Sequence, residues 1–102
     1  MEESEVMERL KTFRERIDNL DAALIHILAE RFRCTDEVGM LKAKHALSSK
    51  DQNREERQFA RARSMAEGSG SDPQVIEDVL RFVIEKVVGR HERIANEYMA
   101  EG

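Results

Sequence analysis

The first half of the chain places an apolar residue at every third or fourth position. The members of this repeat are Leu10, Phe13, Ile17, Leu20, Leu24, Ile27, Cys34, Val38 and Leu41. This spacing lines them up along one side of an α-helix, as a seam kept over several heptads. It predicts a first helix over about residues 5–44, roughly 60 Å long at 1.5 Å per residue. Gly39 interrupts the pattern at a tolerable cost of about 1 kcal/mol relative to alanine.

A second helix is predicted after a short break. Ser49 followed three positions later by Gln52 has the spacing of a capping box, in which each side chain bonds the backbone N–H of the other. The second helix is therefore expected over about residues 50–67. The glycine- and serine-rich segment 68–71 that follows is the clearest loop signal in the chain.

A third helix is indicated by Asp72-Pro73, which supplies an N-cap and a proline for the first helical position. It is expected over about residues 73–97. One face of it carries Ile76, Leu80, Val83, Val87, Ile94 and Tyr98, with His91 on the same stripe. The sequence thus predicts an all-α fold of three helices, one of them very long, in a single domain over residues 1–102.

The length of the first helix implies a partner. Two shorter helices of the same chain cannot cover an apolar seam that runs over about 60 Å. The most economical partner is a second copy of the chain, because a self-complementary surface closes into a symmetric dimer. We therefore expect a homodimer.

Composition excludes several classes of protein. Charged residues make up 37% and aromatic residues only 5%, which favours helices over a sheet. A net charge of −4 argues against a general nucleic-acid or anionic-membrane surface. The single Cys34 excludes an intrachain disulfide and fits a reducing compartment. No apolar run is long enough for a membrane span, and the acidic start is unlike a signal peptide, so we expect a cytoplasmic, stand-alone protein.

Basic side chains occupy unusual places on the first helix. The next step of the seam after Ile27 is Arg31, and an arginine there must either reach out to solvent or meet an anion. Lys42 lies eleven positions further on, almost in phase with Arg31 and roughly 16 Å along the axis. Arg14 is roughly 26 Å from Arg31 and about 100° around the helix. One small molecule cannot touch both arginines in one chain, so Arg14 would have to come from the partner.

The start of the second helix adds Asp51, Arg54 and Glu55, which share a face at i, i+3 and i+4. Alone, this set is typical of a solvated helix face.

Three segments of the first helix, together with Asp51, Arg54 and Glu55, carry a family resemblance. These segments are Arg14–Asp21, Leu28–Arg31 and Val38–Lys42. With them the chain resembles the all-α (class II) chorismate mutases over about residues 10–93. The resemblance implies three-helix subunits that intertwine through two antiparallel long helices, with Arg14 reaching the partner's site.

The resemblance also implies a reaction, the intramolecular Claisen rearrangement of chorismate to prephenate, without metal or cofactor. An enzyme accelerates such a step by holding the compact reactive conformer and stabilising charge on the breaking ether oxygen. By the resemblance, Arg14 and Arg31 clamp the two carboxylates of the substrate through bidentate hydrogen bonds. Lys42 would reach the ether oxygen and a carboxylate as the main electrostatic catalyst.

The remaining site residues follow from the same resemblance. Glu55 would accept from the substrate hydroxyl, helped by the backbone at Asp51, and Arg54 would add a cation. The family's hydroxyl residue on the third helix is replaced here by Val87, which cannot donate a hydrogen bond. Its Gln or Glu, four residues on, is replaced by His91. A histidine can still donate, either as imidazolium or as a suitable neutral tautomer.

Two alternatives stay open. One is an isochorismate pyruvate lyase-like enzyme on the same fold, against which the Asp51-x-x-Arg54-Glu55 segment argues. The other is a helical dimerisation module without chemistry, in which the seam arginines are dispensable. His26, His45 and Cys34 show no metal-ligand spacing, and we expect no metal and no cofactor.

Overall fold

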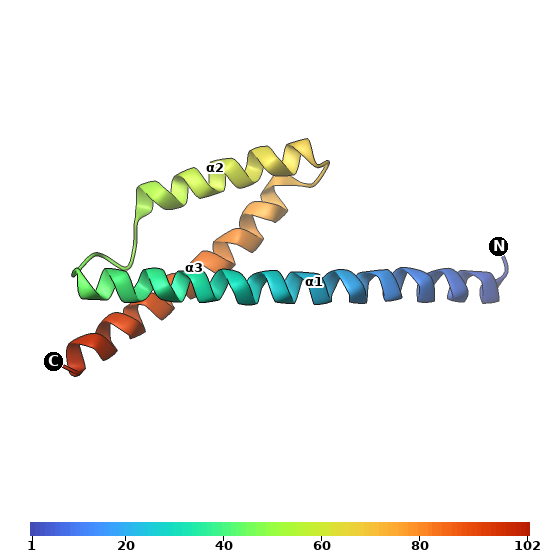
Figure 1. The fold of residues 1–102 in the computed structure, drawn as a ribbon. Coiled ribbons are helices and arrows are strands. Elements are labelled where there is room, and N and C mark those ends of the chain that lie inside the picture. Colours follow the sequence, from blue (N-terminus) through green and yellow to red (C-terminus); the bar gives the residue numbers. More distant parts are fainter. The chain divides into compact units, whose positions relative to one another are not determined.

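The computed structural model describes residues 1–102 as three helices, α1 (Glu3–Lys44), α2 (Gln52–Gly68) and α3 (Pro73–Ala100), without a strand (Figure 1). The all-α prediction is confirmed. Contacts divide the residues into two compact units, an N-terminal segment of Met1–Arg33 and a C-terminal unit of Cys34–Gly102. We describe each unit by itself.

The helix α1 is longer at its start than predicted and ends where expected. Its first turn carries Glu3 and Glu5, and its last turn Lys42 and Lys44, which suits the positive and negative ends of the helix dipole. Beyond its end, Ala46 takes a left-handed φ of 53°, and the N–H of Leu47 bonds the Lys42 carbonyl at 2.9 Å. This closing turn pairs the carbonyls of Leu41, Lys42 and Ala43 where the chain leaves α1 toward α2.

The predicted capping box at Ser49 and Gln52 is wrong. The N-cap of α2 is Asp51, whose Oδ1 accepts from the backbone N–H of Arg54 at 3.0 Å. Residues before it are held differently, because Ser48 Oγ bonds both the N–H and the carbonyl of Lys50. A carboxylate at the positive end of a helix is at least as good a cap as a serine hydroxyl, so the helix begins later, at Gln52.

The start of α3 is as predicted. Asp72 Oδ1 accepts from the N–H groups of Gln74 and Val75 at 2.9 and 3.4 Å, and Pro73 takes the first turn. The helix continues to Ala100, past the predicted end near residue 97. In the preceding turn Gly70 adopts a φ of +77°, a conformation that glycine reaches without the steric penalty of a side chain.

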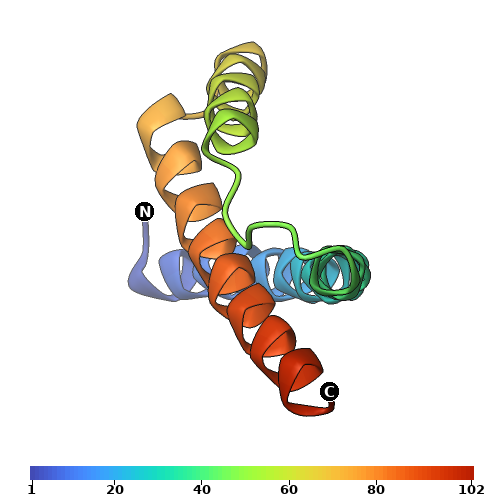
Figure 2. The ribbon, with the colours of Figure 1, turned by 90° about the vertical axis from the view of Figure 1, so that its left-hand side faces the viewer.

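The core of the C-terminal unit lies mainly between α2 and α3, which pack against each other near their connecting turn and diverge away from it (Figures 1 and 2). The buried apolar side chains are Phe59, Ala66, Val83, Ile84 and Ile94. The guanidinium of Arg81 stacks 4.0 Å from the Phe59 ring centroid. Glu77 accepts from Arg81 at 2.9 Å and from Arg63 at 3.2 Å, which ties the two helices together.

The last turns of α1 also belong to this unit and approach α3 closely at Gly39, the buried residue of α1. An alanine Cβ at position 39 would lie 2.7 Å from Cδ2 of His91 and 2.9 Å from Cδ1 of Ile94. Both distances are shorter than van der Waals contact. Gly39, which the sequence suggested was merely tolerated, lets the side chains of His91 and Ile94 pack directly against the backbone of α1.

The N-terminal segment is a single stretch of α1 that buries none of its residues. Its apolar seam is open to solvent, with Ile17 53%, Leu20 67% and Ile27 65% exposed. None of the three helices combines the length and the apolar character that crossing a membrane requires.

Candidate active site

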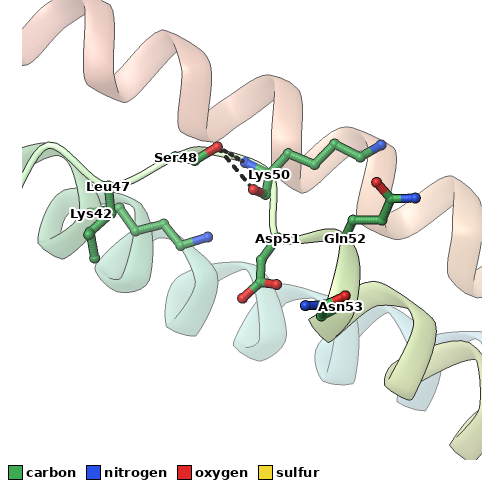
Figure 3. Close-up of a pocket in the computed structure, with 7 residues that line it drawn as sticks. All are labelled: Lys42, Leu47, Ser48, Lys50, Asp51, Gln52 and Asn53. Atoms are coloured by element: carbon green, nitrogen blue, oxygen red, sulfur yellow. Dashed lines mark hydrogen bonds between the residues drawn. The ribbon is translucent and has the colours of Figure 1, made fainter.

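A shallow pocket of about 390 Å³ lies where α1 ends and α2 begins (Figure 3). Its lining residues are Lys42, Leu47, Ser48, Lys50, Asp51, Gln52 and Asn53. The side chains of Lys42 and Asp51 both extend into this space, Lys42 from the last turn of α1 and Asp51 from the N-cap of α2. The structure therefore brings together two residues that the sequence placed in the site.

Glu55 lies one turn into α2, where the positive end of the helix dipole favours a carboxylate. Its side chain is 16% exposed, and Oε1 is 3.9 Å from the ammonium of Lys50. Its other oxygen, Oε2, is shielded from solvent and has no hydrogen-bond partner. Arg54, its neighbour, is exposed and contributes its backbone N–H to the Asp51 cap.

His91 is the buried polar residue of α3, with 4% of its surface exposed. Its Nε2 lies 2.7 Å from the backbone carbonyl oxygen of Thr35 on α1. Its Nδ1 is shielded from solvent without a partner. Beside this contact, Arg90 Nε donates to Asp36 Oδ1 at 3.3 Å. Val87, one turn earlier on α3, is half-buried.

The two site arginines of α1 lie in the N-terminal segment. Arg14 is exposed, whereas Arg31 is half-buried, and its Nη1 is shielded without a hydrogen-bond partner. Because α1 is continuous from Glu3 to Lys44, Arg14 and Arg31 are about 26 Å apart along its axis. The structure does not bring these two arginines together within one chain.

Three of the predicted site residues each carry a polar atom that is buried and unpaired: Arg31 Nη1, Glu55 Oε2 and His91 Nδ1. Leaving such an atom without a partner costs about 1–3 kcal/mol, more for a charged group. Proteins avoid this cost in ordinary cores, and a buried unpaired group calls for an explanation such as a bound water, an ion or a catalytic role. Glu55 Oε2 and His91 Nδ1 belong to the C-terminal unit, and Arg31 Nη1 belongs to the N-terminal segment.

Sequence reasoning missed three participants. Lys50 lies near Glu55, and the Thr35 carbonyl oxygen contacts His91. Gly39 has no side chain, which leaves room for the imidazole to pack against α1. Only Gly39 offered a signal, because a glycine inside an otherwise regular helix often marks a close approach. The structure forms no group of three or more His, Cys, Asp or Glu side chains placed to hold a metal ion.

Comparison with known proteins agrees with the resemblance seen in the sequence. The chain is 40% identical over 75 residues to the T-protein of Enterobacter agglomerans and, over the same length, to the T-protein of Haemophilus influenzae. Each match covers 74% of this chain and 20% of the relative, so the chain spans about a fifth of the length of these curated relatives. The sequence model of the family chorismate mutase type II matches residues 13–92. Since this match covers most of the 102 residues, the chain belongs to the chorismate mutase type II family.

Proposed function

We propose that this protein is a chorismate mutase, which rearranges chorismate to prephenate in one intramolecular step. The observation that carries the proposal is that Glu55 and His91, two predicted site residues of the C-terminal unit, each carry a buried, unpaired polar atom. A ligand that pairs with these atoms would remove the free-energy cost of leaving them unpaired. Chorismate offers a hydroxyl to the carboxylate and an ether oxygen to the ring nitrogen.

In this proposal catalysis is electrostatic. Arg31 and the partner subunit's Arg14 clamp the two carboxylates of the dianion and hold it in its compact conformer. Lys42 aims its ammonium at the ether oxygen as negative charge develops there. Neither acid nor base nor nucleophile is needed, because the bonds form and break within one molecule.

The acidic residues complete the site in different ways. Glu55 accepts the substrate hydroxyl with Oε2, its unpaired oxygen. Asp51 uses its carboxylate to cap α2, which fits a contribution from its backbone. Arg54 contributes to the charge balance. With His91 left out of the count, four cations against two carboxylates leave two positive charges for a substrate that carries two negative ones.

The dimer is part of the proposal. The exposed seam of the N-terminal segment is larger than the isolated apolar residues that monomers normally expose. A second copy, running antiparallel, would cover it and would deliver Arg14 to the partner's site. The separation of about 26 Å between Arg14 and Arg31 supports this arrangement, because one small molecule cannot reach both arginines of one chain.

Two measurements test the function and the shared site. Purified protein should consume the ultraviolet absorbance of chorismate and yield prephenate. Formation of salicylate and pyruvate from isochorismate instead would favour the lyase, and binding of no dianion would favour a dimerisation module.

The second measurement tests the shared site. Arg14→Ala and Arg31→Ala proteins, each nearly inactive alone, are mixed, unfolded and refolded together.

Each heterodimer from this mixture carries one intact site and one doubly damaged site. With random pairing, about a quarter of the wild-type activity should return. Arg33→Ala is the matched control, because Arg33 is exposed and pairs only with Glu30 at 2.7 Å among the ion pairs described. Verified heterodimers without activity would exclude the shared site.

A further inference from the structure

The contact between His91 and Thr35 bears on the protonation state of the proposed site. The Nε2 atom of His91 is 2.7 Å from a backbone carbonyl oxygen. A carbonyl oxygen can only accept a hydrogen bond, so Nε2 must carry the hydrogen. With Nε2 bare, two lone pairs would face each other at this distance in a buried place.

This hydrogen bond determines whether the other ring nitrogen, Nδ1, can donate. A neutral imidazole has one N–H, and in His91 the Thr35 carbonyl takes it. Nδ1 of neutral His91 is therefore an acceptor. It is also shielded, unpaired and part of a side chain that is 4% exposed. An acceptor facing an ether oxygen or a carboxylate is repulsive, whereas the imidazolium presents a second N–H there.

We propose that His91 serves this site only as the imidazolium, donating from Nδ1 to the dianionic substrate while Nε2–H stays on the Thr35 carbonyl. The inference rests on the proposed function. It excludes the neutral tautomer as donor, which the sequence alone left open. Unlike the amide or carboxyl side chain that the resemblance implies at this position, the imidazole makes the hydrogen bond to substrate dependent on a proton from solvent.

A pair of charged groups flanks the contact between His91 and Thr35. It consists of Asp36 on α1 and Arg90 on α3, each next to one member of the contact in the sequence. Asp36 and Arg90 pair with each other and largely cancel. A bound dianion favours the imidazolium over the neutral ring.

Packing keeps the ring in place for this role. Cδ2 of His91 lies against Gly39, where an added Cβ would approach it to 2.7 Å. The imidazole therefore cannot swing away from Thr35 to offer Nε2–H elsewhere without opening the contact between α1 and α3. The carbonyl and the glycine together restrict both the tautomer and the direction of Nδ1.

The test compares kcat/KM for chorismate between pH 5.5 and 9 in the wild type, His91→Gln and His26→Gln dimers. Histidine ordinarily changes charge between about pH 5 and 8. The wild type and the exposed-histidine control, His26→Gln, should lose about tenfold per pH unit on the alkaline side, toward a total loss of about 10²–10³. His91→Gln should be flat, because an amide donates at every pH. His91→Leu should be poor throughout, with an unchanged circular dichroism spectrum.

A second readout does not depend on activity. Nitrogen-15 NMR of histidine-labelled protein at alkaline pH should find Nε2 protonated and Nδ1 bare in His91, and the reverse tautomer would overturn the inference. Active wild-type and His91→Gln proteins with the same pH profile would overturn it as well. Absence of chorismate turnover in all variants at every pH is a different result: it rejects the proposed function, and the inference falls with it.

Discussion

The two ends of α1 are built on the same apolar repeat but have different surroundings. In the C-terminal unit, Gly39 is buried against His91 and Ile94 of α3. In the N-terminal segment, Leu20 and Ile27 are 67% and 65% exposed. Burying such a side chain stabilises a protein by about 1.5–3 kcal/mol. The C-terminal end of α1 thus contacts its own chain through Gly39, which lies outside the repeat, while Val38 and Leu41 of the repeat stay 44% and 57% exposed. The exposed repeat of the N-terminal segment is the surface that the proposed dimer would use.

Placing a charged residue in the exposed apolar repeat of the N-terminal segment should have the largest effect on assembly and activity. Leu20→Glu places a carboxylate in the proposed interface, where burial without a partner is prohibitive. We expect loss of the dimer and, because Arg14 then reaches no site, loss of all mutase activity. Sedimentation and the chorismate assay measure both. Ala22→Glu, about 200° around the helix from Leu20, is the control, and a dimeric, active Leu20→Glu protein would show that the seam is not the interface.

The next effect concerns the chemistry at the other end of α1. Lys42→Ala should lower turnover by about 10²–10³, since it removes a preorganised donor to developing charge. Lys44→Ala removes an exposed lysine of the same helical turn and should leave turnover unchanged. Steady-state kinetics on folded protein compares the two. Near-normal turnover in Lys42→Ala would remove this residue from the mechanism.

Alanine substitutions at two glycines should have opposite effects on stability, because one position is tightly packed and the other is open. Gly39→Ala forces a Cβ against the ring of His91 and the end of Ile94. The overpacking cost of about 1–3 kcal/mol exceeds the gain of about 1 kcal/mol in helix propensity, so we expect lower stability. Gly89→Ala meets nothing within 4 Å and should be more stable. Urea denaturation of both variants measures the difference, and equal shifts would mean that Gly39 is not a tight contact.

The smallest effect is a pH dependence inside the C-terminal unit. The hydrogen bond from Arg81, followed by that from Arg63, holds the pKa of Glu77 below its usual value, against the opposing effect of desolvation. A carboxyl whose pKa is lowered by folding stabilises the protein above its unfolded pKa, and this stabilisation is lost as the pH falls through the folded pKa. Wild-type stability should therefore decline in acid more steeply than that of Glu77→Gln.

Thermal unfolding between pH 7 and 2.5 tests this difference. The two proteins should differ at neutral pH and converge at the acid end, where the wild-type carboxyl is protonated as well. Glu85→Gln, on an exposed part of α3, should parallel the wild type. Parallel curves for Glu77→Gln and the wild type would mean that the Arg63–Glu77–Arg81 cluster adds no stability.

Much of the fold could be read locally. The three helices follow from apolar periodicity, and the start of α3 follows from Asp72-Pro73, because both signals act over one or two helical turns. The start of α2 could not be read so easily. Ser49 and Asp51 are both good caps, and the choice between them depends on how Ser48 and Lys50 hold the preceding turn.

The candidate site, like the fold, has features that the sequence predicts and features that depend on tertiary packing. The sequence determines that Arg31 and Lys42 lie nearly in phase on one helix, since charge and helical phase are properties of the chain itself. The dianionic substrate and the role of Glu55 follow only from the resemblance to the family. The tautomer of His91 and the need for glycine at position 39 depend on the imidazole of α3 packing against the backbone of α1, more than fifty residues away in sequence, with Nε2 2.7 Å from the Thr35 carbonyl oxygen. No local pattern encodes that distance, because it is set by how α1 and α3 pack.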